Sequence, residues 1–244
     1  MVRMVRPTPR PSVSEFANKN RKLSRDDSKE HGNYRWERAP YQKDMMDVIL
    51  TKGKRKYVAM LASQMGKSLV IMNLWLYLIR VRPCTILAML PSIKDAKKFS
   101  KLRLRPFIRD NLTDVIKTSS KDGSTLLEKH FPGGHLLLVG SNVASDLAAV
   151  TGNAAFVDEF DRCAKEAVNA AGDKEGDPLM LLWKRLANDP GAFVYVSGTP
   201  TIKGASPTED LWERSNKMMY MLPCPECGKD QFMEKSRLRW EEVA

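Results

Sequence analysis

Gly66, Lys67 and Ser68 are the residues whose types and spacing first suggest chemistry. An apolar run at residues 57–61 precedes them and an apolar helical pattern at 68–80 follows, the strand–loop–helix context of a phosphate-binding loop. Backbone N–H groups of the loop and of the helix N-terminus are suited to hold phosphate oxygens. The other loop residues expected to contact a nucleotide are Ser63, Gln64 and Met65.

Lys67 and Ser68 carry the specific roles in such a loop. The lysine would reach the β- and γ-phosphates of ATP, and the serine hydroxyl would bind Mg²⁺. Leu61 stands where the pattern G-x-x-x-x-G-K-[ST] has its first glycine, which favours a variant class of loop. A Gly-Lys-Ser tripeptide also arises by chance, so its sequence context carries this interpretation.

Asp158 and Glu159 follow directly after a third apolar run, at residues 154–157. A charge at the tip of a buried strand is costly unless it has a partner. Mg²⁺ held by Asp158 and Ser68 would provide one, and Glu159 would then orient and activate an attacking water as the catalytic carboxylate. An ordinary transition from strand to loop is the alternative.

Two further polar positions fit a nucleotide site. Ser197, Gly198 and Thr199 follow another apolar run, at residues 192–196. The hydroxyls of Ser197 and Thr199 could bond to the γ-phosphate or to the acids and so couple hydrolysis to motion. A plain turn is the alternative. Gln42 has a side-chain amide that can pair with the N6/N7 edge of adenine, which by itself is a weak indication.

Cys224 and Cys227 have the C-x₂-C spacing of a zinc knuckle. A structural zinc site needs four ligands, and no Cys or His follows Cys227. This is half a Zn²⁺ site. The missing ligands belong to a longer form of the protein or to another chain, or do not exist.

Apolar runs that alternate with helical patterns predict βαβ units and an α/β fold with a mainly parallel central sheet and helices on both faces. Ligands of such sheets bind at the carboxyl ends of the strands. Residues 124–139 differ, because two apolar runs flank Pro-Gly-Gly and predict a hairpin. We expect a flexible basic arm at 1–38, an ATPase domain at 39–220 and the start of a zinc-knuckle-like linker at 221–244.

The chain of 244 residues has a net charge of +11, from 40 Lys and Arg against 29 Asp and Glu. This excess favours a nucleic-acid partner, although a basic protein need not have one. No apolar run is long enough to cross a membrane and no secretory signal opens the sequence, so a cytoplasmic location is expected. Four cysteines in such a chain do not form a disulfide framework.

Taken together, these blocks resemble the large terminase subunit of tailed phages and prophages, in its lambda-type GpA group. The resemblance covers about residues 35–240. The blocks that carry it, in order, are Tyr41-Gln42, Gln64–Ser68, Leu90-Pro91, Phe131–Gly134, Val139-Gly140, Val157–Asp161, Gly176–Pro178, Ser197–Gly204 and Cys224–Gly228.

The resemblance implies an additional-strand (ASCE), RecA-like P-loop NTPase that uses ATP and Mg²⁺ to move double-stranded DNA into a procapsid through its portal. It implies that Gln42 binds adenine, that Lys67 and Ser68 bind phosphate and Mg²⁺, that Asp158 holds the metal, and that Glu159 is catalytic. It also implies a homo-oligomeric ring, and a small terminase subunit that contacts the N-terminal arm.

Two departures from the family pattern stand out. Ser63 occupies the loop position where many large terminases have an arginine finger, and the sequence does not identify a substitute. The C-terminal nuclease of the family has no counterpart before Ala244, so no DNA cleavage is expected of this chain.

Two other functions remain open from the sequence. A superfamily 2 helicase-like ATPase shares these motifs but needs a second RecA-like domain. A truncated prophage fragment without activity would bind only DNA or partner subunits. The basic stretch at 94–109 fits either a DNA contact or a solvated helix face.

Overall fold

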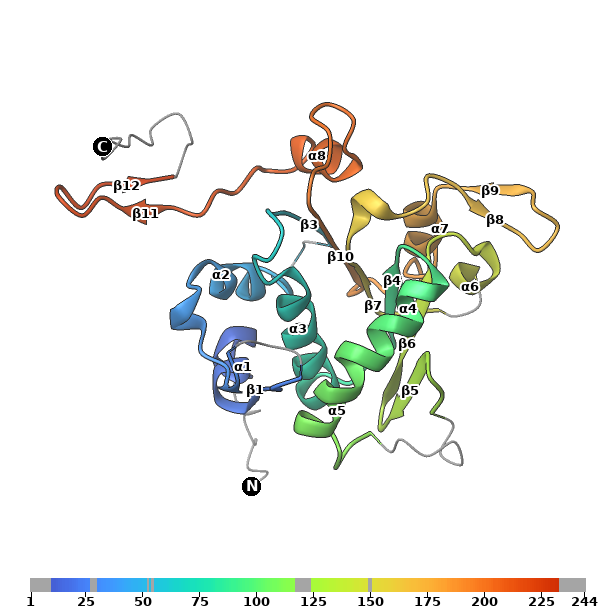
Figure 1. Ribbon diagram of the computed structural model, residues 1–244, viewed down its shortest axis with the longest axis horizontal. Helices are drawn as coiled ribbons and strands as arrows, with labels where there is room; N and C mark the ends of the chain where they lie inside the picture. The colour runs from blue at the N-terminus through green and yellow to red at the C-terminus, as the bar shows by residue number, and fades with distance from the viewer. Residues whose placement is uncertain are drawn as a thin grey trace, which may run out of the picture.

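A six-stranded sheet forms the centre of the molecule (Figure 1). The computed structural model describes residues 10–26, 30–51, 53, 55–116, 124–148 and 151–232. All neighbouring strands of the sheet are parallel except the last pair. In spatial order the strands are β3 (Lys56–Met60), β10 (Phe193–Gly198), β7 (Ala154–Val157), β4 (Ile86–Leu90), β6 (Gly134–Gly140) and β5 (Glu128–Phe131).

Strand β10 lies between β3 and β7, although it comes last of the three in the chain. Ser197 pairs with Ala59 of β3, and Val196 pairs with Val157 of β7, so the carboxyl ends of three strands are level. This insertion is the additional strand expected of the fold class. It brings the segments after three sequence-distant strands to one edge of the sheet.

Both faces of the sheet are covered. Alternate residues of a strand point to opposite faces. In β4, Ile86 and Ala88 therefore join one apolar core, and Leu87 and Met89 join the other. Burial on both faces explains why the strands are continuous apolar runs rather than alternating ones. The expected α/β architecture is confirmed.

Helix α3 (Lys67–Val81) is the central element of the larger core, and every residue from Val70 to Ile79 is buried. Trp75 packs edge-on against Phe99 and Phe156, with ring centroids 5.9 and 6.0 Å apart. Loss of such a buried ring costs about 3–5 kcal/mol in other proteins. The core thus fixes α3, whose first residues belong to the expected phosphate loop.

A long helical run begins at Ile93 and continues past Pro106. It comprises α4 (Ile93–Phe99), a π-helical turn η2 (Ser100–Leu104) and α5 (Arg105–Asn111). Pro106 lies in the first turn of α5 and does not end the run. Pro106 has no N–H to donate, and it stands where the run changes from the π-helical turn to α5, so the regular hydrogen-bond pattern is already interrupted there.

The N-terminal segment is ordered where it is described, so the expectation of a flexible arm over 1–38 is wrong for residues 10–26 and 30–38. Helix α1 (Val13–Asn20) has a capping box between Ser12 and Glu15, and it packs on α3. Val13 and Ala17 are buried in the larger core. The segment has few apolar residues, but those of α1 fall on one face of the helix. Amino-acid composition alone does not reveal such an arrangement.

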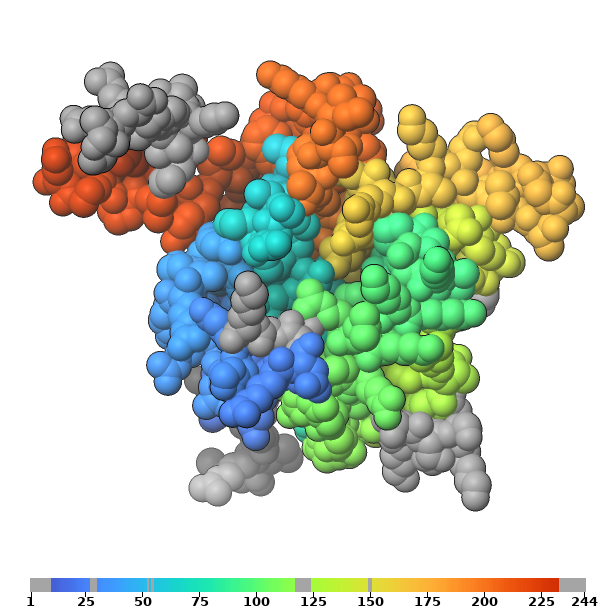
Figure 2. Space-filling model, in the orientation of Figure 1, coloured from blue at the N-terminus to red at the C-terminus, as the bar shows by residue number. Residues whose placement is uncertain are grey.

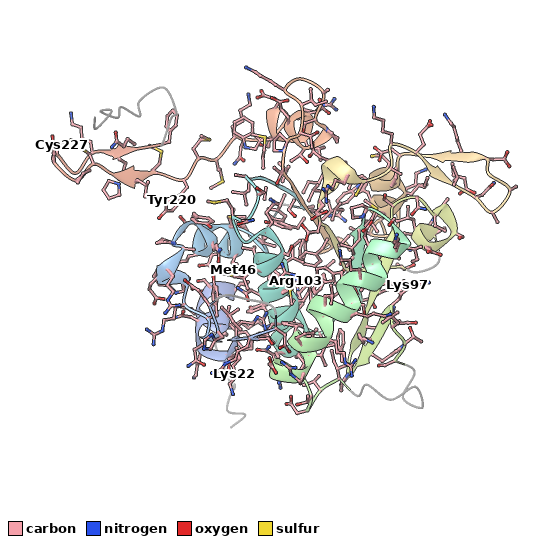
Figure 3. The ribbon with its side chains drawn as sticks, viewed as in Figure 1. Lys22, Met46, Lys97, Arg103, Tyr220 and Cys227 are labelled. Carbon is pink, nitrogen blue, oxygen red and sulfur yellow. The ribbon has the colours of Figure 1, made fainter. Side chains whose placement is uncertain are left out.

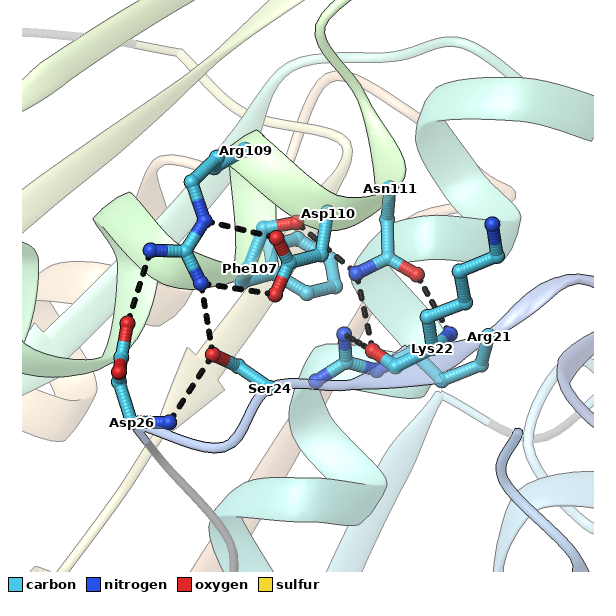
Figure 4. Close-up of polar contacts among 8 residues, drawn as sticks. All are labelled: Arg21, Lys22, Ser24, Asp26, Phe107, Arg109, Asp110 and Asn111. Carbon is cyan, nitrogen blue, oxygen red and sulfur yellow. Dashed lines mark hydrogen bonds and ion pairs between the residues drawn. The ribbon is translucent and has the colours of Figure 1, made fainter. Parts of the chain in front are cut away.

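The segment after α1 is attached to α5 by the polar contacts drawn in Figure 4. Arg21 is 2% exposed, with its guanidinium 4.5 Å from the Phe107 ring centroid. Arg109 donates to Asp26 at 2.8 Å and to Ser24 at 2.9 Å. These contacts place β1 (Lys22–Leu23), which pairs with β2 (Gly32–Asn33), beside the larger apolar core.

The remaining elements are short. The predicted hairpin is confirmed, since β5 and β6 are antiparallel around Pro132 and Gly133, where Gly133 has a φ of +88°. No helix in the described part of the chain is long and apolar enough to cross a membrane. The other helices and strands are η1 (Trp36–Arg38), α2 (Tyr41–Asp47), α6 (Ala144–Ala148), η4 (Phe160–Arg162), β8 (Ala167–Val168), β9 (Lys174–Gly176), α7 (Pro178–Lys184), α8 (Pro207–Glu213), β11 (Leu222–Pro223) and β12 (Asp230–Gln231).

The attachment of α1 to α2 can be tested at Asp47. Its carboxylate accepts hydrogen bonds from the Ser14 backbone N at 2.9 Å and from the Ser14 hydroxyl at 2.6 Å. We expect Asp47→Ala to lower the free energy of unfolding by about 1–3 kcal/mol, measured by thermal denaturation. Asp44→Ala, at an exposed position of the same helix, should change it by less than about 0.5 kcal/mol. Equal effects of the two changes would show that the contact is not stabilising.

Candidate nucleotide site

A cleft of about 900 Å³ opens at the carboxyl edge of the sheet. In Figure 2 the cyan loop before α3 lies near the yellow segment after β7 and the orange segment after β10. The predicted site residues that line this cleft are Gln42, Ser63, Gln64, Met65, Gly66, Lys67, Ser68, Asp158, Glu159 and Thr199. Residues that are far apart in the sequence therefore share one cavity.

The phosphate loop takes an unusual backbone path. Gln64 and Gly66 have φ angles of 62° and 77°. A side chain at position 66 would collide with the Gln42 amide, so only glycine fits here. At the place of the missing first glycine, the Leu61 backbone N donates to the Gly198 carbonyl at 3.1 Å. Leu61 thus extends the pairing between β3 and β10 by one residue.

Lys67 connects the loop to the end of β10. Its ammonium donates to the Thr199 hydroxyl at 2.5 Å and to the Ala62 carbonyl at 2.8 Å. Burial lowers the pKa of Lys67, and the charges of Asp158 and Glu159 act in the opposite direction. The side chain is thus held among acceptors at the place where phosphate oxygens would bind.

Asp158 lies at the centre of the site and is 7% exposed. Its carboxylate accepts from the Ser68 hydroxyl at 2.5 Å, the Ser197 hydroxyl at 2.9 Å and the Glu159 backbone N at 3.0 Å. Burial raises the pKa of Asp158, while the two serine hydroxyls lower it. One carboxylate thereby joins α3, β7 and β10.

The donor set of this site fits Mg²⁺. A carboxylate and a hydroxyl are hard oxygen ligands, and Mg²⁺ usually takes one or two such groups together with water and phosphate oxygens. Ser68 and Asp158 are already adjacent and both line the cleft. They are the residues that would hold the ion.

Glu159 is placed differently from Asp158. Its side chain is 51% exposed and pairs with Arg162 at 3.2 Å. Its φ of 55° is a left-handed conformation, which costs a non-glycine residue roughly 1–3 kcal/mol. This strained turn directs the chain into η4 immediately after β7, and leaves the carboxylate in the cleft where water has access.

Gln42 is 4% exposed, and its side-chain amide packs against the loop at Gly66. Its side-chain oxygen accepts from the Tyr34 hydroxyl at 3.0 Å. The neighbouring Tyr41 hydroxyl donates to the Met65 carbonyl at 3.0 Å. Tyr41 and Gln42 therefore both line the cleft, and both contact the loop.

The cleft is also lined by three charged residues that the sequence patterns did not single out: Asp161, Arg162 and Arg103. The Thr208 hydroxyl of α8 donates to Asp161, and the absence of a side chain at Gly198 leaves room for this contact. Asp161 lies three residues after Asp158, which could have drawn attention to it. Arg103 projects from the π-helical turn, and no local pattern indicates that it reaches this site.

Cys224 and Cys227 lie away from the cleft, on the projecting hairpin of β11 and β12 (Figure 3). A turn with Gly228 at a φ of 70° connects the strands. A hydrogen bond from the Cys227 backbone is the main reason that the pKa of Cys224 is lowered. Among the described residues no group of three or more Cys, His, Asp or Glu is arranged to bind a metal.

The geometry of the cleft agrees with sequence comparison. The profile of the family described as "Phage terminase large subunit gpA, ATPase domain" matches residues 28–244. The chain belongs to this family. Membership separates this terminase ATPase domain from the superfamily 2 helicases that share its motifs.

Curated relatives of this terminase ATPase domain include the large terminase subunits of Escherichia phage lambda and Enterobacteria phage P21. The lambda protein is 24% identical over 237 residues, which are 95% of this chain and 36% of the relative. The P21 protein is 24% identical over 254 residues, covering 99% of this chain and 38% of the relative. The chain therefore spans little more than a third of their length.

A solved structure shows the same fold. The large terminase of bacteriophage HK97 superposes with a TM-score of 0.62 over 82% of this chain and 40% of that protein, at 15% identity. At this level of identity the likeness concerns the fold alone. It supports the strand order that assembles the site of this terminase ATPase domain.

The buried charge of Asp158 makes stability depend on pH. Its pKa in the folded chain is raised, so ionisation costs stability once the pH exceeds the unfolded value of about 3.9, and the cost levels off above the folded pKa. We expect Asp158→Asn to raise the melting temperature at pH 7.5 in EDTA, by about 2–4 °C per kcal/mol of cost removed. The gain should vanish near pH 4.

Asp44→Asn, at an exposed carboxylate, is the matched control and should have little effect at either pH. A lower melting temperature for Asp158→Asn at pH 7.5 would mean that hydrogen bonds outweigh the burial of the charge.

Proposed function

We propose that this chain is the ATP-hydrolysing motor domain of a terminase that moves double-stranded DNA into a procapsid. The observation that carries the proposal is the contact of Asp158 with Ser68 beside the contact of Lys67 with Thr199. A phosphate-binding lysine, a pair of oxygen ligands and a coupling hydroxyl thus meet at the ends of β3, β7 and β10.

Each side chain has a role that follows from its place. Lys67 leaves the Ala62 carbonyl and binds the β- and γ-phosphate oxygens, whose charge it partly neutralises. Ser68 and Asp158 would hold Mg²⁺, and the ion would supply positive charge that offsets the negative charge developing on the phosphates. Glu159 accepts a hydrogen bond from the attacking water and orients it toward the γ-phosphate.

Coupling between hydrolysis and movement starts at Thr199 in this proposal. Its hydroxyl accepts from Lys67 in the structure, so displacement of Lys67 by nucleotide changes the contacts at the end of β10. Gly198 lies against Thr208 of α8, and Thr208 donates to Asp161. A shift at Thr199 therefore reaches α8 and the segment after β7 through direct contacts.

Gln42 would recognise the adenine base of the nucleotide. Its side chain lines the cleft and touches the loop, and one lone pair of its oxygen is used by Tyr34. The remaining amide atoms would pair with the base. This contact would also report to the loop whether a nucleotide is bound.

The wider assembly follows from the family. We propose that the domain works in the host cytoplasm as a homo-oligomeric ring, with the portal of a procapsid, a small terminase subunit and double-stranded DNA as partners. The cysteine pair would be half of a Zn²⁺ site in a longer form of the protein, because two thiolates do not complete a tetrahedral site.

The function is tested by steady-state ATP hydrolysis with and without duplex DNA, and by binding of a fluorescent ATP analogue. Lys67→Ala should lose binding and turnover, since it removes the main phosphate contact. Glu159→Gln should keep binding and lower kcat by about 10²–10⁴-fold, because only water activation is affected.

Exposed residues of the same types supply the controls, and Lys165→Ala and Glu175→Gln should leave turnover unchanged. Normal turnover in Glu159→Gln would contradict the assigned role. Tight MgATP binding without turnover in the unmodified chain would support the inactive-fragment alternative.

A further inference from the structure

The outer face of the run from α4 to α5 carries exposed Asp95 and Leu102 beside a row of basic side chains. The residues of this row, the basic stripe, share one side of the helix and are all exposed: Lys94, Lys97, Lys98, Lys101 and Arg105. Their spacing of three or four residues is that of one helix face. The opposite face holds Ala96, Ser100 and Leu104, all buried.

The charge of the basic stripe is not balanced by nearby acids. In the described part of the chain none of its five side chains forms an ion pair, whereas exposed Arg214 and Lys217 pair with acids four residues away. Asp95, the only acid between residues 94 and 109, bonds to Ser92 at the start of α4. Like charges at such spacing repel one another, so the row of cations does not stabilise the helix that carries it.

We propose that the basic stripe binds the phosphate backbone of double-stranded DNA, independently of sequence. This inference rests on the proposed function and identifies the surface that meets the DNA. Eleven helical steps span about 16 Å, along which a duplex carries roughly nine or ten phosphate charges. A straight row of cations faces such a target along its whole length.

The side-chain types favour a duplex over a single strand. Proteins that bind single strands stack bases on aromatic side chains, and the stripe has none. It also lacks the Asn and Gln amides that read adenine in the major groove. A motor that moves along any sequence needs contacts of this phosphate-only kind.

The same helical run reaches the nucleotide cleft. Arg103 lies in the π-helical turn between stripe residues Lys101 and Arg105, and it lines the cleft. Figure 3 places Arg103 toward α3 and Lys97 on the outer side of the run. The wider π turn directs Arg103 away from the stripe. DNA bound to the stripe would therefore affect the nucleotide cleft through one continuous helix. We expect DNA to stimulate ATP hydrolysis by this route.

The test compares two variants that lose the same charge. The triple change Lys94→Gln, Lys97→Gln and Lys101→Gln removes three stripe cations and keeps good helix formers. The control changes three exposed lysines elsewhere, Lys165, Lys203 and Lys229, to Gln. Affinity for a fluorescent 30-base-pair duplex is measured by anisotropy between 50 and 200 mM salt, with circular dichroism to verify folding.

The stripe variant should bind at least about 10-fold more weakly, and its slope of log K against log salt should fall by about 2.7, or 0.9 per lost phosphate contact. The control should bind within about threefold of the unmodified chain with the same slope, and Lys94→Arg, Lys97→Arg, Lys101→Arg should retain full binding. Equal losses in both Gln variants, an unchanged slope, or no duplex binding by the unmodified chain overturns the proposal.

Hydrolysis separates this inference from the proposed function. Basal ATP turnover without DNA should be the same in the stripe variant and the unmodified chain, and only the stimulation by DNA should be lost. Stripe-dependent DNA binding without any ATP turnover would leave the surface standing and remove the motor function. ATP turnover together with DNA binding that does not depend on the stripe would support the motor function and contradict the proposed surface.

Discussion

The position of the Asp158 carboxylate is the constraint on which the rest of the structure depends. It is almost fully buried, and the burial raises its pKa, so it must be surrounded by donors. Ser68, Ser197 and the Glu159 backbone supply them from three different elements. The strand order β3-β10-β7 makes these contacts possible, because β10 lies between the strand that precedes the loop and the strand that precedes the two acids.

Side chains that pack directly against the backbone account for two glycines in this region. Gly66 leaves room for Gln42, and Gly198 leaves room for Thr208 and Asp161. Glu159 takes a left-handed conformation directly after the buried strand. Such strained positions persist only where the surrounding packing fixes them, and the smaller core, which holds the neighbouring Val157 and Phe160, provides that packing.

Peripheral elements extend the site beyond its central residues. The segment after α1 is attached to α5, and Leu23 of β1 reaches the cleft. The π-helical turn η2 sends Arg103 to the same cleft while the outer face of the helix remains basic. The cleft therefore borders on the segment after α1 and on the helical run from α4 to α5.

The sequence alone determined the central strands β3, β7 and β10, the helix at residues 68–80 and the hairpin, because each leaves a local pattern of apolar runs, glycines and polar strand ends. Only the tertiary structure decided the strand order, the packing of residues 10–38, the continuation of the helix through Pro106, and the presence of Asp161, Arg162 and Arg103 in the cleft. These features arise from contacts between residues far apart in the chain, and such contacts leave no periodic trace in the segments that form them.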